Sequence, residues 1–270
     1  MSVRIQPLVK WTAAAADTLR RPRGLVILIY HRVGARTAVS VDLPRPLFAE
    51  QLAVLASEWT PVGLDEAAAL LAGPGTPPGR PRLCLTFDDG TVDFVEEALP
   101  ELVKAGLPAT LFVATDHVES GREFPDDGRP VSWAGLRDAV STGLVTIGSH
   151  THTHRLLDRV PGPEAAVELD RSIGLIEDRL GVACDHFAYP KALLGSPGAQ
   201  DEVRRRFRTA AVAGTRPNPY GRTDLHRLRR SPVQVGDGMR WFRRKAAGGM
   251  ALEDDLRTLR NRRRYAGTVT

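Results

Sequence analysis

Short runs of consecutive apolar residues recur along the chain and alternate with segments in which apolar residues follow a helical spacing. Residues 25–30 form the first continuous apolar run, and residues 109–113 and 209–213 are later examples. Runs of this length predict β-strands that are buried on both faces. Residues 163–180 are the clearest predicted helix, because their apolar side chains recur every three or four positions.

The remaining elements continue this alternation. Further strands are predicted at 83–87, 144–147, 184–190 and 228–233, and further helices at 46–57, 66–72, 95–105, 132–142, 199–207 and 238–247. We expect Asp65 to cap the helix at 66–72, and residues 116–130 to form a loop. Strands and helices that alternate in this way predict a single parallel-stranded α/β domain, closed like a barrel rather than open.

Composition fits a folded protein with a full core, since 42% of the 270 residues are apolar and 26% are charged. We expect an N-terminal arm at residues 1–24, the barrel at 25–250 and a basic tail at 251–270. The formal net charge is +5, and much of the surplus lies near the two ends. Aromatic residues are few and are not interleaved with the arginines, so no nucleic-acid partner is predicted.

Cysteine usage and hydropathy bear on the cellular location. Cys84 and Cys184 each lie in an apolar strand signal, so we expect buried reduced thiols rather than a disulfide framework. No apolar run reaches the roughly 18 residues expected of a membrane helix, and the N-terminal segment lacks the apolar core of a signal peptide. These patterns predict a cytoplasmic protein without an integral membrane segment, which is compatible with peripheral membrane association. They indicate no oligomeric state.

Polar residues suited to catalysis stand where four predicted strands end. The dipeptides at these positions are Tyr30-His31, Asp88-Asp89, Ser149-His150 and Tyr189-Pro190. In a parallel barrel the C-terminal ends of the strands meet on one face, where the chemistry collects. Because neighbouring residues of a strand point in opposite directions, Asp88 and Asp89 should not have the same role. Carboxylates from one strand and histidines from another predict a hydrolytic metal site.

The arrangement of the histidines depends on how the chain leaves its strand. If residues 150–154 stay extended, all three histidines face one side. If the chain turns helically, His150 and His154 share a face and His152 does not. We favour the helical turn, because the preceding strand is expected to end near Gly148. One carboxylate and two imidazoles leave a coordination position open, which is typical of a catalytic zinc rather than a structural one.

Two other hydrolytic mechanisms are disfavoured. Ser149 adjoins His150, but Gly148-Ser149-His150 is not a Gly-x-Ser-x-Gly elbow, and adjacent residues do not easily form a nucleophile–base pair. Neither cysteine lies in an exposed, electropositive setting, so the sequence does not indicate thiol catalysis.

Residues 86–90 (Thr-Phe-Asp-Asp-Gly) and 150–154 (His-Thr-His-Thr-His) resemble the first two motifs of the polysaccharide deacetylases. This is the NodB-homology, chitin-deacetylase-like carbohydrate esterase family four. Three further segments look like members of that family, at 30–33, 108–113 and 187–190. The resemblance covers roughly residues 25–235. It implies a single-domain distorted (β/α) barrel and a metal-dependent hydrolase of carbon–nitrogen bonds other than peptide bonds. Its substrate would be an N-acetylated amino sugar in a glycan, a lipid-linked sugar or a small glycoside.

The resemblance also implies roles for individual residues. Asp88 would be the catalytic base, and Asp89, His150 and His154 would hold a divalent metal, zinc in the first instance. The backbone N–H of Tyr189 would help to stabilise the tetrahedral oxyanion. In the implied reaction Asp88 deprotonates a water at the metal, the water attacks the acetamide, and acetate leaves a free amine on the sugar.

The later part of the chain departs from the family pattern. No Asp-x-x-Asp-Trp segment follows Tyr189, and no late Leu-x-x-His supplies a general acid. His31 is an alternative acid, because it leaves a strand on the expected active face, whereas the late His226 has the wrong spacing. Arg230 could hold Asp88 ionised through a bidentate contact. Two other functions stay open: an O-acetyl carbohydrate esterase on the same scaffold, and a catalytically weak barrel that binds glycan.

Overall fold

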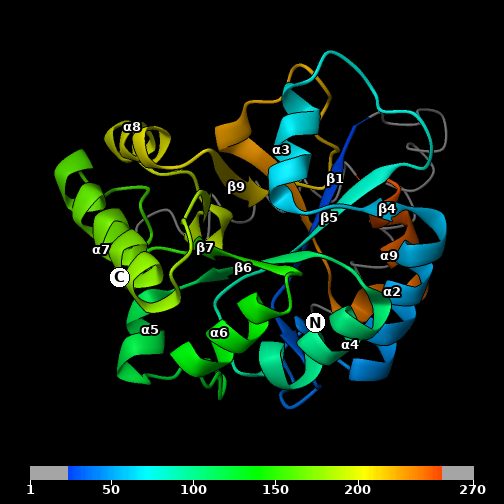
Figure 1. The fold of residues 1–270 in the computed structure, drawn as a ribbon, viewed down its shortest axis with the longest axis horizontal. Helices are drawn as coiled ribbons and strands as arrows, with labels where there is room; N and C mark the ends of the chain where they lie inside the picture. The colour runs from blue at the N-terminus through cyan, green and yellow to red at the C-terminus, as the bar shows by residue number, and fades with distance from the viewer. Residues whose placement is uncertain (1–23, 251–270) are drawn as a thin grey trace, which may run out of the picture.

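The computed structural model describes residues 24–250, and Figure 1 shows a barrel of strands surrounded by helices. Apart from Gly24, the arm expected at 1–24 and the tail expected at 251–270 lie outside the described residues. The main sheet contains eight strands in the order β1-β10-β9-β8-β7-β6-β5-β4. Their bounds are β1 Val26–Tyr30, β4 Thr60–Pro61, β5 Arg82–Phe87, β6 Ala109–Val113, β7 Val145–Ser149, β8 His186–Ala188, β9 Thr209–Ala213 and β10 Leu228–Pro232.

The sheet closes because β1 pairs in parallel with both β5 and β10. Leu28 of β1 aligns with Leu85 on one side and with Ser231 on the other. Of the eight strands, β4 is attached only to the beginning of β5, so the other seven form the ring. The parallel barrel expected from the sequence is therefore confirmed. Two short strands, β2 (Arg32–Val33) and β3 (Asp42–Leu43), form a separate pair.

Helices cover the barrel on several sides, with α7 and α8 at one side of Figure 1 and α2 and α9 at the other. Their bounds are α2 Arg45–Glu58, α3 Leu64–Ala72, α4 Leu99–Ala105, α5 Thr115–Ser120, α6 Trp133–Ser141, α7 Gly162–Leu180, α8 Pro197–Arg206 and α9 Gly238–Ala246. A π-helical turn, η1 (Phe94–Ala98), leads into α4, and the shorter turns are η2 Pro190–Ala192, η3 Leu225–Arg227 and η4 Val235–Asp237. The amphipathic spacing that predicted α7 is present, and Gly181 ends this helix in the left-handed conformation.

The apolar core divides into two clusters that alternate along the strands. In β1, Val26, Leu28 and Tyr30 belong to a large cluster shared with α2, α4, α6 and α7, whereas Ile27 belongs to a smaller cluster with Phe112. Successive strand residues point to opposite faces of a sheet. The large cluster therefore lies between the barrel and its helices, and the smaller one, to which α3 also contributes, lies on the inner face. Both cysteines are buried and free, as expected.

The structure corrects two local expectations. Gly63, not Asp65, is the N-cap of α3, and the Asp65 carboxylate instead lies 2.6 Å from the guanidinium of Arg208. The expected loop at 116–130 begins as the short helix α5, which ends at Gly121 with a φ of 72°. Only glycine adopts this left-handed C-cap without a steric penalty.

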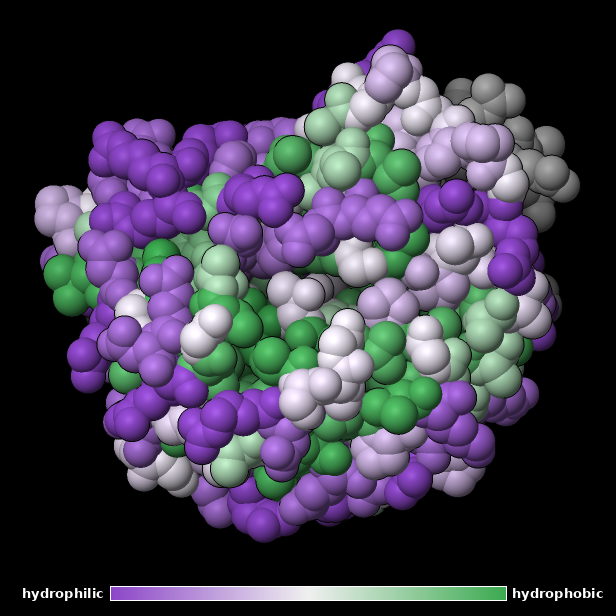
Figure 2. Space-filling view, viewed as in Figure 1, coloured by the Kyte–Doolittle hydropathy of each residue, from purple (hydrophilic) through white to green (hydrophobic). Residues whose placement is uncertain are grey.

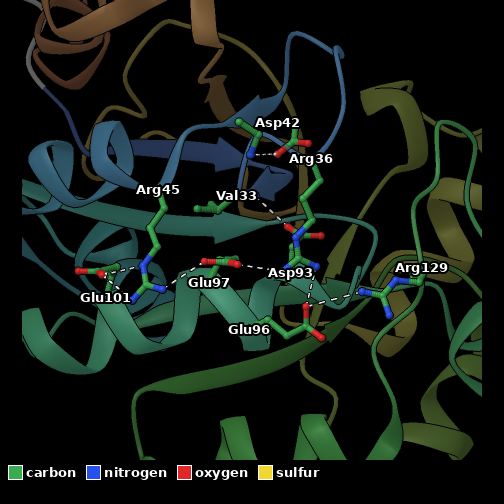
Figure 3. Close-up of polar contacts among 10 residues, drawn as sticks. Val33, Arg36, Asp42, Arg45, Asp93, Glu96, Glu97, Glu101 and Arg129 are labelled. Carbon is green, nitrogen blue, oxygen red and sulfur yellow. Dashed lines mark hydrogen bonds and ion pairs between the residues drawn. The ribbon is translucent and has the colours of Figure 1, made fainter.

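A network of ion pairs joins the segment after β2 and the beginning of α2 to η1 and α4 (Figure 3). Arg36 and Arg45 reach the glutamates of η1 and α4 over distances of 2.6 to 3.2 Å. Such exposed pairs contribute only about 0–1 kcal/mol each. Beside them, the buried carboxylate of Asp93 accepts the N–H of Val33 at 2.8 Å. This contact ties β2, which directly follows His31, to the segment after β5.

Hydrophilic residues dominate the rim of the face drawn in Figure 2, and hydrophobic residues gather nearer its middle. Among residues 24–250, the exposed large apolar side chains are Val103, Val167 and Val235, which belong to three separate elements. No helix within residues 24–250 combines the length and apolar character that crossing a bilayer requires.

Candidate active site

Asp89, His150 and His154 come together beyond the C-terminal ends of β5 and β7. Their ligand atoms all lie within 4.8 Å of one another, and Asp89 Oδ1 is 3.6 Å from His150 Nε2 and 3.2 Å from His154 Nε2. A tetrahedral zinc site with ligand distances near 2.1 Å needs ligand atoms roughly 3.4 Å apart, so these donors fit a divalent ion. The side chains of His154 and Asp89 are 17% and 19% exposed, which leaves the cluster accessible from solvent.

His150 is held in the protonation state that a metal ligand needs. Its Nδ1 lies 2.7 Å from the carbonyl oxygen of Ala188. A carbonyl only accepts, so Nδ1 carries the proton and the lone pair of Nε2 points toward Asp89. Burial lowers the pKa of His150 to about 4. The imidazole is therefore neutral near pH 7, as metal binding requires.

The loop that carries the histidines is neither extended nor helical. Thr151 and His154 have φ values of 67° and 62°, in the left-handed region. His152 turns away and places its Nδ1 2.9 Å from the hydroxyl of Thr115. The predicted helical turn is thus wrong, although His150 and His154 do face a common partner and His152 does not. Residue spacing carries no signal for left-handed threonine or histidine, which are uncommon in that conformation.

The backbone at Asp89 and Gly90 explains why a glycine follows the two aspartates at the end of β5. Asp89 has a φ of 75°. Burial raises the pKa of its carboxyl, but the hydrogen bond and charge of His154 lower it further, so the net pKa is well below its usual value. A Cβ at Gly90 would approach Val113 Cγ1 to 2.9 Å. Only glycine therefore fits immediately after the paired aspartates.

Asp88, next to Asp89 in the chain, faces Arg230 instead. Arg230 is fully buried on β10 and donates from Nη1 and Nη2 to the two oxygens of Asp88 at 2.6 and 2.8 Å. Nη1 also donates to the hydroxyl of Thr86 at 3.0 Å. Burial raises the pKa of Asp88, but the charge and hydrogen bond of Arg230, together with the charges of His150 and His31, lower it further, so the net pKa is below its usual value. The bidentate contact expected from the sequence is present, and it holds Asp88 ionised and in a fixed orientation.

His31 lies close enough to both aspartates to affect their ionisation. Its charge is among the influences that lower the pKa values of Asp88 and Asp89. Its Nδ1 is buried and has no hydrogen-bond partner. His31 therefore lies near the carboxylates and has a ring nitrogen without a hydrogen-bond partner, so it is a candidate proton donor.

Two other sequence candidates lie outside this arrangement. The N–H of Tyr189 donates to the carbonyl of Ala211 at 3.0 Å, so it extends the pairing of β8 with β9. The role expected for Tyr189 is corrected accordingly, because an engaged amide is not free to bind an oxyanion. His226 precedes β10, at the end of the barrel opposite the aspartates, and its Nε2 lies 2.8 Å from the carbonyl oxygen of Phe207.

Sequence reasoning missed Glu168 of α7. One of its carboxylate oxygens accepts the N–H groups of His152 and Thr153 at 3.1 and 2.9 Å. In the sequence Glu168 is one of several charged residues on an amphipathic helix, and its position in the helical pattern does not distinguish it from its neighbours. Only the packing of α7 against the histidine loop shows this contact.

Comparison with known proteins identifies the family. Residues 75–206 match the family model described as polysaccharide deacetylase. The chain carries a polysaccharide deacetylase domain. This deacetylase fold is similar to the structure of IcaB from Ammonifex degensii, with 28% sequence identity and a TM-score of 0.71 over 83% of this chain and 97% of IcaB.

Two further relatives extend the comparison. The Streptococcus pyogenes deacetylase PplD, solved in complex with acetate, is 20% identical, with a TM-score of 0.71 over 88% of this chain and 98% of PplD. YxkH of Bacillus subtilis (strain 168), which is named for the same family, is 23% identical over 237 residues, or 87% of this chain and 81% of YxkH. The family and its (β/α) barrel are therefore confirmed. Membership of this family supports a hydrolase that deacetylates carbohydrates.

Proposed function

We propose that this deacetylase removes N-acetyl groups from an amino sugar, with a divalent metal, preferably zinc, held by Asp89, His150 and His154. The observation that carries the proposal is the separation of the two aspartates. Asp89 faces the imidazoles of His150 and His154. Asp88, the preceding residue, is ionised and is held in a fixed orientation by Arg230. This separation supports a ligand role for Asp89 and a base role for Asp88.

The chain's own residues then have distinct tasks. A divalent ion in this site would supply Lewis acidity, which makes a water easier to deprotonate and polarises the acetyl carbonyl. Asp88 accepts the proton of the attacking water. Each of its oxygens accepts one hydrogen bond from Arg230 and keeps a second lone pair for this proton. The low pKa of Asp88 keeps the base unprotonated over a wide pH range.

His31 is proposed as the group that protonates the departing amine. An amine is a poor leaving group unless it receives a proton as the carbon–nitrogen bond breaks, whereas nitrophenolate leaves without one. We therefore expect His31→Gln to slow release of acetate from an N-acetyl sugar by about 100-fold. The same variant should hydrolyse 4-nitrophenyl acetate at nearly the wild-type rate. Comparable losses on both substrates would show that His31 does not act as the acid.

Acetate release from defined sugars tests the proposed function. The enzyme is incubated with oligomers of N-acetylglucosamine and with O-acetylated xylo-oligosaccharides, before and after a chelator removes metal. We expect turnover of the N-acetyl substrate that stops with the chelator and returns with zinc. Turnover of the O-acetyl substrate alone would identify a carbohydrate esterase. Binding of either sugar without turnover by the zinc-loaded protein would identify a glycan-binding barrel.

A further inference from the structure

The loop between the two histidines is held in a conformation that it would not adopt by itself. Thr151 is fully buried, with a φ of 67°, and His154 has a φ of 62°. A β-branched residue in the left-handed region is a strained outlier. Such strain costs on the order of 1–3 kcal/mol for each residue and persists only where the surroundings enforce it. Some neighbouring element must therefore hold this loop.

Helix α7 supplies the holding contacts from two positions one turn apart. Glu168 accepts the N–H groups of His152 and Thr153 with one oxygen, at 3.1 and 2.9 Å, and the hydroxyl of Thr153 with the other, at 2.9 Å. These contacts lie in the three-residue segment that separates His150 from His154. A carboxylate that accepts several hydrogen bonds from one segment fixes that segment firmly.

The second position on α7 holds the beginning of the same loop. The hydroxyl of Ser172 lies 2.8 Å from the hydroxyl of Ser149, which in turn accepts the N–H of Thr151 at 3.2 Å. Both serines are fully buried. Glu168 and Ser172 are four residues apart, so they lie on the same face of the helix. This face of α7 thus contacts the loop on both sides of Thr151.

We propose that Glu168 is a positioning residue that sets the separation of His150 and His154 for metal binding. This inference rests on the proposed function, in which Asp89 and these histidines are the ligands. Glu168 does not contact the cluster itself. It acts through the backbone of His152 and Thr153, as groups outside the ligand set often determine metal affinity.

Glu164 provides a matched control on the same helix. It lies one turn before Glu168, and its carboxylate is 3.0 Å from Arg155, the residue that follows His154. Both partners of this ion pair are more than 40% exposed, at 41% and 54%. Removing Glu164 therefore takes a carboxylate from the same helix and the same neighbourhood without touching the backbone between the histidines.

The test compares Glu168→Ala, Glu168→Gln and Glu164→Ala by zinc affinity and by the visible absorption spectrum of the cobalt-loaded proteins. We expect Glu168→Ala to lower zinc affinity by about 10- to 100-fold and to change the cobalt spectrum. Glutamine can still accept from the backbone and donate to the Thr153 hydroxyl, so Glu168→Gln should restore affinity to within a few-fold of wild type. Glu164→Ala should match wild type in both measurements.

The outcomes separate this inference from the proposed function. If Glu168→Ala binds zinc as wild type does and keeps the wild-type cobalt spectrum, while its metal-free form melts earlier, Glu168 is only structural and the inference is wrong. If the wild-type protein itself binds neither zinc nor cobalt, the proposed metal site is wrong, and the positioning role of Glu168 is wrong as well. A change in the cobalt spectrum reports ligand geometry, which a loss of fold stability alone does not alter.

Discussion

Replacing Asp88 with asparagine should reduce turnover of the N-acetyl sugar by about 10²- to 10⁴-fold, while the protein continues to bind zinc. Asparagine has nearly the shape of aspartate but cannot accept the proton of the attacking water. Asp88 faces Arg230 rather than the histidines, so its loss should leave the ligand set complete. The measurement is the rate of acetate release, together with zinc affinity by chelator competition.

His154→Ala is the control for this experiment. His154 Nε2 lies 3.2 Å from Asp89 Oδ1, so its removal should lower zinc affinity by about 100-fold or more, beyond what changes outside the ligand set cause. Thermal unfolding of both variants without metal checks that each is folded, because Asp88→Asn leaves the buried Arg230 beside a neutral side chain. Equal zinc loss in folded Asp88→Asn and His154→Ala would overturn the separate roles of the two aspartates.

Arg230→Met should destabilise the protein by about 3–5 kcal/mol, because it leaves the buried Asp88 carboxylate without its partner. Arg36→Met is a matched control. Arg36 likewise makes two contacts with carboxylate oxygens, one on Glu96 and one on Glu97, but it lies at the surface, with 39% of its side chain exposed, so its loss should cost less than about 1 kcal/mol. Urea denaturation at pH 7 measures both changes. Equal losses of stability in the two variants would contradict the conclusion that Arg230 stabilises the fold by pairing with the buried Asp88.

The same variant has a predictable pH dependence. In the wild type the pKa of Asp88 is lowered in the folded state, so its contribution to stability is present above the unfolded pKa and is lost as the pH falls through the folded value. Without the charge and hydrogen bond of Arg230, burial is opposed only by the charges of His150 and His31, so this pKa should rise. The stability deficit of Arg230→Met should therefore shrink as acid protonates Asp88. The acidic limb of its kcat/KM profile should move to higher pH, and an unmoved limb would show that Asp88 does not set it.

Most of the barrel could be predicted because its strands are buried on both faces. A parallel strand such as β1 then appears as an unbroken apolar run, and the spacing in α7 shows equally well which side of that helix packs. The predictions failed where a boundary depends on three-dimensional partners. Asp65 pairs with Arg208 instead of capping α3, and no local pattern shows that Arg208 lies within reach.

The candidate site was predictable in its members but not in its backbone. Aspartates and histidines at strand ends were sufficient to group the Asp88-Asp89 pair with His150 and His154, because parallel strands end on one face of a barrel. The choice of Asp89 over Asp88 as the ligand came from the resemblance to the polysaccharide deacetylases. The left-handed Thr151 could not be predicted, since its conformation is imposed by contacts from α7. The engaged amide of Tyr189 was missed for a related reason: the strand pairing that uses it is known only once β8 and β9 are aligned.

The position of Arg230 makes the proposed catalytic base, Asp88, dependent on closure of the barrel. Asp88 follows β5, but its guanidinium partner lies 142 residues further on, in the last strand within residues 24–250. A nascent chain that has not yet produced β10 lacks the guanidinium partner of Asp88. Contacts this distant in sequence form late, because the intervening chain must first be ordered. Hydrolytic activity should therefore appear only when β10 has joined the barrel. An N-terminal fragment that lacks β10 should show no partial activity.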